Sequence, residues 1–198
     1  MGLYQVRIHG RGGQGVVTAA ELLSMAAFAE GRHAQAFPSF GSERMGAPIV
    51  AFCRIADRPI RTREPIDEPD ALIIQDPTLL HAVDLFSGLG TEGCVLINSS
   101  RNVNELGLGD LRARHPRVRL LTVPATDLAR EHVGRPTPNA VLLGAFAAMT
   151  GIVSLDAIAT ALRDRFSAAV AGANHAGAVA AHEFIERELS KVAEAVGA

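Results

Sequence analysis

The segment that decides the fold spans residues 3–37 and reads LYQVRIHGRGGQGVVTAAELLSMAAFAEGRHAQAF. Residues 3–9 predict a β-strand, and residues 14–29 predict a helix with one apolar stripe. Gly31 is a stop signal for that helix, and residues 33–37 predict the next strand. The chain therefore opens with a strand, a glycine-rich turn and a helix.

The remainder of the chain continues this alternation. Several short apolar runs are typical of strands covered on both faces, and the predicted strands are residues 49–55, 71–75, 95–98 and 119–123. Helices are predicted at residues 78–85, 126–133, 139–150, 155–166 and 179–196. Residues 59–63 follow the 49–55 strand after a connection too short for a helix, which predicts a β-hairpin. We expect a single α/β domain over residues 1–198, with a Rossmann-like, mixed but mostly parallel sheet flanked by helices and a helical C-terminal part.

Charge and composition exclude several functions. The 198 residues include 19 Lys+Arg and 21 Asp+Glu, a net charge of -2 that offers no general footprint for nucleic acid. The longest strongly apolar run, residues 140–149, is too short for a membrane span, which needs about 20 residues. The N-terminal sequence has no secretory signal pattern, so we expect a cytoplasmic protein without a membrane partner.

Two cysteines, Cys53 and Cys94, lie far apart in the sequence and form no CxxC unit. They provide neither a disulfide framework nor a complete zinc or iron–sulfur ligand set. We therefore expect no metal site in this chain, and any redox centre that it serves belongs to another subunit.

The glycine-rich turn after the first strand satisfies GxGxxG at Gly10, Gly12 and Gly15. Glycines permit close backbone approach, and the free N–H groups at a helix start attract phosphate or carboxylate. The candidate cofactor-binding residues are Gly10, Arg11, Gly12, Gly13, Gln14 and Gly15. The alternative is a tight turn needed only for packing. No acidic residue ends the second strand at Phe37, so a dedicated NAD site is disfavoured.

A second segment, residues 36–48, mixes aromatic, glycine and hydroxyl residues between two strands. Ser42, Glu43 and Arg44 lie at its middle and are candidates for contacting substrate, coenzyme A or a partner subunit, because loops on a rigid scaffold often carry function. The alternative is a surface loop that pairs internally. Polar residues also follow the predicted strands, as candidate crevice residues or as turn and cap residues: His9, Asp76, Asn98, Ser99 and Thr126.

Residues 139–149 carry little polar surface. They form either core or a subunit interface, since an exposed apolar patch of this kind is unusual for a monomer. We expect a partner to bury part of this surface.

Ordered motifs along nearly the whole chain resemble the gamma subunit of 2-oxoacid:acceptor oxidoreductases of the pyruvate:ferredoxin oxidoreductase type. The motifs are HGRGGQG (9–15), TAAE (18–21), AQAFPSFG (34–41), ER (43–44), GAP (46–48), EPD (68–70), QDPTLL (75–80), LLGAF (142–146) and TGIVSL (150–155). The likeness is greater to the pyruvate and aromatic 2-oxoacid branch than to the 2-oxoglutarate branch.

This resemblance implies a complex that converts a 2-oxoacid and coenzyme A to acyl-CoA, CO2 and a reduced acceptor. Thiamine diphosphate and iron–sulfur clusters would be held by partners, a thiamine-binding and a ferredoxin-like subunit, with no cofactor held by this chain alone. The leading substrates are pyruvate and an aromatic acid such as phenylglyoxylate, and no catalytic residue is assigned in this chain. The alternative function is a standalone nucleotide-binding module without catalytic activity.

Overall fold

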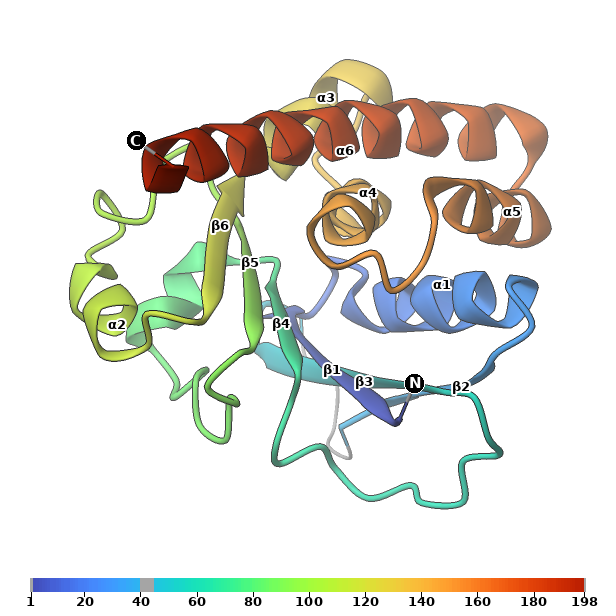
Figure 1. The fold of residues 1–198 in the computed structure, drawn as a ribbon. Helices are drawn as coiled ribbons and strands as arrows, with labels where there is room; N and C mark the ends of the chain where they lie inside the picture. Colours follow the sequence, from blue (N-terminus) through green and yellow to red (C-terminus); the bar gives the residue numbers. More distant parts are fainter. Residues whose placement is uncertain (1, 40–44, 198) are drawn as a thin grey trace.

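A computed structural model describes residues 2–39 and 45–197 (Figure 1). Six strands form one sheet in the order β2-β3-β1-β4-β5-β6. Their bounds are β1 Tyr4–Arg11, β2 His33–Pro38, β3 Pro48–Ala56, β4 Ala71–Ile74, β5 Cys94–Asn98 and β6 Arg119–Val123. Strand β3 is antiparallel to both of its neighbours, whereas β1, β4, β5 and β6 are parallel. The mixed, mostly parallel sheet predicted from the sequence is confirmed.

The helices lie on both faces of this sheet (Figure 1). Their bounds are α1 Val16–Ala29, α2 Gly109–Arg114, α3 Ala125–His132, α4 Asn139–Thr150, α5 Leu155–Arg165 and α6 Ala168–Gly197, with a 3-10 helix η1 at Pro77–His81. Helix α1 covers β1, β2 and β3, and α6 packs across α3, α4 and α5. Helix α5 starts where the Ser154 side chain accepts a hydrogen bond from the Ala157 N–H at 3.1 Å.

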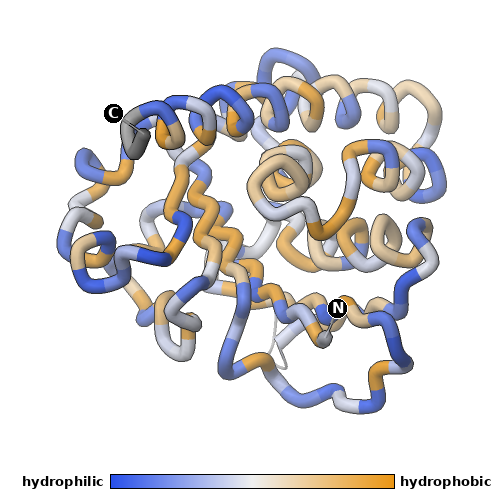
Figure 2. Tube along the Cα trace, viewed as in Figure 1, coloured by the Kyte–Doolittle hydropathy of each residue, from blue (hydrophilic) through white to orange (hydrophobic). Residues whose placement is uncertain are grey.

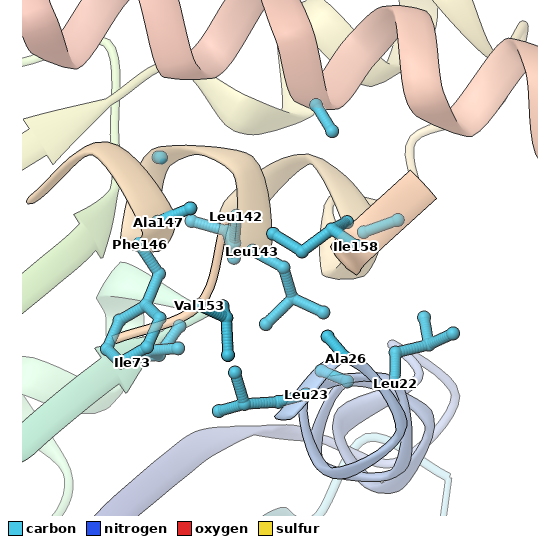
Figure 3. Packing of buried hydrophobic residues seen from close by; sticks show 14 of the residues in the cluster. Leu22, Leu23, Ala26, Ile73, Leu142, Leu143, Phe146, Ala147, Val153 and Ile158 are labelled. Atoms are coloured by element: carbon cyan, nitrogen blue, oxygen red, sulfur yellow. The ribbon is translucent and has the colours of Figure 1, made fainter. Parts of the chain in front are cut away.

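The central strands separate two hydrophobic cores. In β4, Ala71 and Ile73 face the core shared with α1, α4 and α6, while Leu72 and Ile74 face a smaller core. Figure 3 shows the larger core, where Phe146 of α4 lies beside Ile73 of β4, and Leu23 of α1 lies on the side of Val153. A strand buried on both faces needs a continuous apolar sequence, which is why β4 is ALII.

Helix α4 belongs to this core, and the expectation that a partner buries it is wrong. Residues 140–147 are all buried within the chain itself, and Met149 is also buried. The close approach of α6 explains this burial, because Gly144 lies against the backbone of Ala178 and leaves no room for a side chain. The apolar surface that suggested an interface is internal packing.

The expected hairpin of residues 49–55 and 59–63 is also wrong. Residues 59–63 are not a strand, because β3 is already paired on both edges, with β1 and with β2. Residues 57–70 instead run below the sheet toward β4 (Figure 1). The antiparallel neighbour on this edge of β3 is β2, and Phe37 is opposite Phe52.

Three helices differ from the sequence prediction. The helix expected at residues 78–85 is only the 3-10 helix η1, and the short helix α2 was not predicted. Helix α6 begins at Ala168, well before the expected residue 179. Polar and apolar residues alternate along it (Figure 2), and among the described residues no helix is long and apolar enough to span a membrane.

Candidate functional site

Strands β1 and β4 are parallel neighbours at the middle of the sheet. The chain leaves β1 toward one edge of the sheet and leaves β4 toward the other edge. Helix α1 leads from β1 toward β2, whereas η1 leads from β4 toward β5 on the other side. Open α/β sheets bind ligands at the carboxyl ends of strands at such a reversal. The glycine-rich turn follows β1 there, and Gln75 and Asp76 follow β4.

The glycine-rich turn is tighter than the sequence indicated, because β1 continues through Gly10 and Arg11. The Gln14 N–H donates to the Arg11 carbonyl at 3.1 Å, and helix α1 begins after Gly15, whose φ is 74°. A Cβ on Gly15 would lie 2.6 Å from Asn139 Nδ2. Glycine is therefore favoured here by the backbone conformation, and an added Cβ would also require the Asn139 side chain to shift.

Arg11 is held by partners on both sides of the turn. Its Nε lies 3.2 Å from Asp76 Oδ2, its Nη2 donates to Thr78 Oγ1 at 2.8 Å, and its Nη1 donates to the Gly46 carbonyl at 3.0 Å. The Gln14 side chain joins the same cluster, since its amide donates to Asp76 Oδ2 at 2.8 Å and accepts from the Arg11 N–H at 2.8 Å. The cluster fixes the turn against the end of β4.

Asp76 remains ionised in this setting. Burial raises the pKa of the carboxyl group, but hydrogen bonds from Thr78 and Gln14 outweigh the burial, so the pKa is lowered overall. The carboxylate therefore offsets the positive charge of Arg11. An anion bound at the turn would be recognised mainly by backbone N–H groups and the start of α1, with Arg11 as a paired cation.

Buried polar side chains line the same edge of the sheet. His9 lies near the carboxyl end of β1, Gln75 follows β4, and Asn98 is the last residue of β5. All three side chains are buried. Asn98 donates to the Gln75 carbonyl and to Thr126 Oγ1, both at 2.8 Å, and accepts from the Thr126 N–H. Asn98 and Thr126, two of the five polar residues predicted to follow strands, therefore bind each other.

His9 and Gln75 retain unpartnered polar atoms. His9 Nε2 and both amide atoms of Gln75 are buried without a hydrogen-bond partner. The pKa of His9 is lowered to about 4 by burial and by the charge of Arg7, so the imidazole is neutral. Gln75 was predicted only as the last residue of the strand at residues 71–75, although an amide in an apolar run is a signal for a site residue.

The second candidate segment reaches the glycine-rich turn. Ser42, Glu43 and Arg44 lie outside the described residues, so their placement stays a prediction. The described residues that follow them return to the turn: Gly12 donates to the Ala47 carbonyl at 3.0 Å and accepts from the Gly46 N–H at 3.2 Å. Met45 lies beside Gly13 with 87% of its surface exposed. Two segments singled out by sequence therefore meet at one site.

A cavity of about 460 Å³ adjoins the turn through Asn139. Thr18, Arg135 and Asn174 supply polar groups, and Phe166 and Val170 supply apolar surface. Such a mixture suits part of an extended organic ligand. Among residues 2–39 and 45–197, no group of three or more His, Cys, Asp or Glu side chains is placed to hold a metal ion.

Residues 5–184 match the family model described as pyruvate ferredoxin/flavodoxin oxidoreductase. The chain belongs to this family. It is 44% identical to pyruvate synthase subunit PorC of Methanothermobacter thermautotrophicus, over 93% of this chain and 97% of that protein. It is 46% identical to the pyruvate/ketoisovalerate oxidoreductases common subunit gamma of Pyrococcus furiosus, over 93% and 98%. The family member is thus of the gamma-subunit type.

Solved structures agree with this assignment. The crystal structure of pyruvate oxidoreductase subunit PORC from Thermotoga maritima matches with a TM-score of 0.78 and 34% identity, over 92% of this chain and 97% of that chain. The fold also occurs in 2-oxoglutarate:ferredoxin oxidoreductase from Magnetococcus marinus, with a TM-score of 0.69 and 16% identity. That match covers 95% of this chain but 32% of the other, so there the same fold is part of a longer polypeptide.

Proposed function

We propose that this chain is the gamma subunit of a cytoplasmic, multi-subunit pyruvate:ferredoxin-type oxidoreductase that makes acetyl-CoA, CO2 and reduced acceptor. The observation that supports this most is the match to subunits named for pyruvate over almost their whole length. Ketoisovalerate, which the Pyrococcus relative is named for, is the second substrate to test. The aromatic acid phenylglyoxylate has no support among these relatives.

In this proposal the partner subunits hold the thiamine diphosphate and the iron–sulfur clusters. The two cysteines of this chain are both free and buried, which is consistent with that division. The role of this chain is to bind an anionic group of coenzyme A at residues 10–15, through the N–H groups at the start of α1. Ser42, Glu43 and Arg44 are proposed to contact substrate, coenzyme A or a partner at the same site.

Reconstitution tests the assignment. The chain is co-expressed with the thiamine-binding and ferredoxin-like subunits, and dye reduction is measured with pyruvate, ketoisovalerate and phenylglyoxylate. We expect activity that needs coenzyme A and is highest with pyruvate. A chain that never joins these subunits would support the alternative of a standalone nucleotide-binding module, and highest activity with phenylglyoxylate would overturn the substrate.

The glycine-rich turn has its own test, because Arg11 is paired with Asp76 at 3.2 Å. Arg11→Ala removes a cation and also uncovers a carboxylate, so the KM for coenzyme A should rise about 10- to 150-fold, the equivalent of one charge-assisted hydrogen bond. The double variant Arg11→Ala/Asp76→Asn separates the two effects. It stays impaired if Arg11 contacts the ligand, and it recovers if the exposed carboxylate caused the loss.

A turn that serves only packing predicts a different result. Both variants would then assemble with an unchanged KM for coenzyme A and differ only in stability. The hydrogen bonds of Arg11 to Thr78 and to the Gly46 carbonyl favour this reading as the second candidate. The kinetic comparison decides between the two.

A further inference from the structure

A second groove lies at the opposite end of the sheet from the candidate site. Residues 2–3, at the start of the described chain, and residues 56–62, which leave β3, enclose about 610 Å³. The end of β3 lies beside the start of β1, because Ile55 is opposite Tyr4. The glycine-rich turn is at the other end of β1. A ligand in this groove therefore cannot share the proposed coenzyme A site.

Unpaired cations line the groove. Arg58 and Arg61 are exposed, and neither guanidinium has a hydrogen-bond or ion-pair partner among the described residues. Asp57 is the acidic residue of the described lining and is already engaged in an interaction within the protein. Arginine presents a planar fork of donors that matches a carboxylate. Both guanidinium groups are therefore free to pair with acidic groups of a ligand.

The floor of the groove is apolar. Leu3 is 46% exposed, and Pro59 and Ile60 belong to the same lining. The floor is formed by residues from two distant parts of the chain. Arginine is enriched and lysine is depleted in the central part of protein–protein interfaces, and the core of such an interface is more apolar than its rim.

We propose that this groove binds an extended acidic segment of another subunit of the oxidoreductase. Carboxylates of that segment pair with Arg58 and Arg61, and one of its apolar side chains covers Leu3. A partner segment fits better than a small anion because the lining combines the two arginines with apolar surface of Leu3, Pro59 and Ile60, which a small anion would leave uncovered. This inference rests on the proposed membership in a multi-subunit complex and adds where a partner makes contact.

The test uses the co-expressed complex with the double variant Arg58→Gln/Arg61→Gln. Glutamine preserves most of the side-chain length and removes the charge, and both positions are exposed, so folding should be unaffected. We expect the dissociation constant for this subunit to rise about 10- to 100-fold, as for the loss of one to two charge-assisted contacts. The effect should be largest at about 50 mM NaCl and smaller at about 300 mM, where surface charges are screened.

Two matched variants complete the experiment. Arg101→Gln/Arg114→Gln removes two exposed arginines outside the groove and should assemble as the unaltered chain does. Leu3→Ser tests the apolar floor and should weaken assembly without changing the unfolding temperature of the isolated chain. Mass photometry of diluted complexes measures the dissociation constant for the unaltered chain and for the three variants.

Each outcome has one meaning. Wild-type affinity in the Arg58→Gln/Arg61→Gln complex overturns the inference and leaves the proposed function intact. Failure of the unaltered chain to join any partner overturns the proposed function instead. If the isolated chain dimerises and the double variant makes it monomeric, the face belongs to a second copy of this chain, and the inference is also wrong.

Discussion

At the residue scale, the buried His9 couples stability to pH. Its pKa is lowered to about 4 in the folded protein by burial and by Arg7, whereas an unfolded chain has a histidine pKa near 6.5. Between these values the unfolded state binds more protons. The contribution of neutral His9 to the free energy of unfolding is fully present above about pH 6.5. It is lost as the pH falls toward 4, and the total loss is about 3 kcal/mol.

Denaturant unfolding of the wild type and of His9→Gln at several pH values measures this contribution. Acid-sensitive groups elsewhere act equally in both proteins, so the difference between their stability curves isolates His9. We expect the wild type to lose more stability than the variant over that pH window. Parallel curves would show that His9 titrates normally in the folded state.

The glycines at positions 15 and 31 give a second prediction at this scale. Both have a positive φ, 74° and 77°, but a Cβ at Gly15 meets Asn139 while a Cβ at Gly31 meets nothing within 4 Å. Both alanine variants should lose about 1 kcal/mol for the backbone conformation, and Gly15→Ala should lose up to about 1 kcal/mol more because the Asn139 side chain must leave its rotamer. Equal losses in urea unfolding would mean that Asn139 moves aside freely.

The sequence predicted the role of some residues at this site and not of others. GxGxxG identified the need for glycine at position 15, because that motif reports a local backbone requirement. The pairing of Arg11 with Asp76 was not predictable, since the two residues become neighbours only when β1 lies beside β4. The position of Gln75 in an apolar run was a signal in the sequence, but the absence of hydrogen-bond partners for its side chain depends on the residues that surround the edge of the sheet.

At the scale of elements, packing between helices overrides what composition suggests. The apolar helix α4 was read as a possible interface, but it lies within the chain's own core, beneath α6. Local periodicity cannot distinguish a helix covered by its own chain from one covered by a partner. The hairpin error has a similar origin, because only the strand order shows that both edges of β3 are occupied.

Two helical glycines test this packing directly. A Cβ on Gly144 of α4 would overlap the Ala178 carbonyl of α6, whereas a Cβ on Gly172 of α6 meets nothing within 4 Å. Gly144→Ala should destabilise the fold by about 3 kcal/mol or more, because backbone must move. Gly172→Ala should stabilise it by about 0.5–1 kcal/mol through helix propensity. A tolerated Gly144→Ala in thermal unfolding would show that α6 shifts without cost.

At the scale of the whole molecule, the sheet keeps the two thiols apart. Cys53 of β3 is opposite Val6, Val6 is opposite Ala71, and Ala71 is opposite Cys94 of β5. Three strand spacings make about 14 Å, well beyond the about 4.4–6.8 Å between Cα atoms that a disulfide needs. The sequence predicted that no bridge forms, and the strand order supplies the geometric reason.

This separation leads to a prediction for the purified chain. Burial raises the pKa of Cys53 to about 12 and also raises that of Cys94, so neither thiol is a thiolate at neutral pH. Ellman's reagent should react with both thiols only after denaturation, and the native chain should be colourless. Denaturation in EDTA should not shift the midpoint, because no resident metal contributes to stability. Rapid reaction of a native thiol would contradict the burial of Cys53 and Cys94. A visible iron–sulfur absorbance from the isolated chain would contradict the assignment of the redox centres to partner subunits.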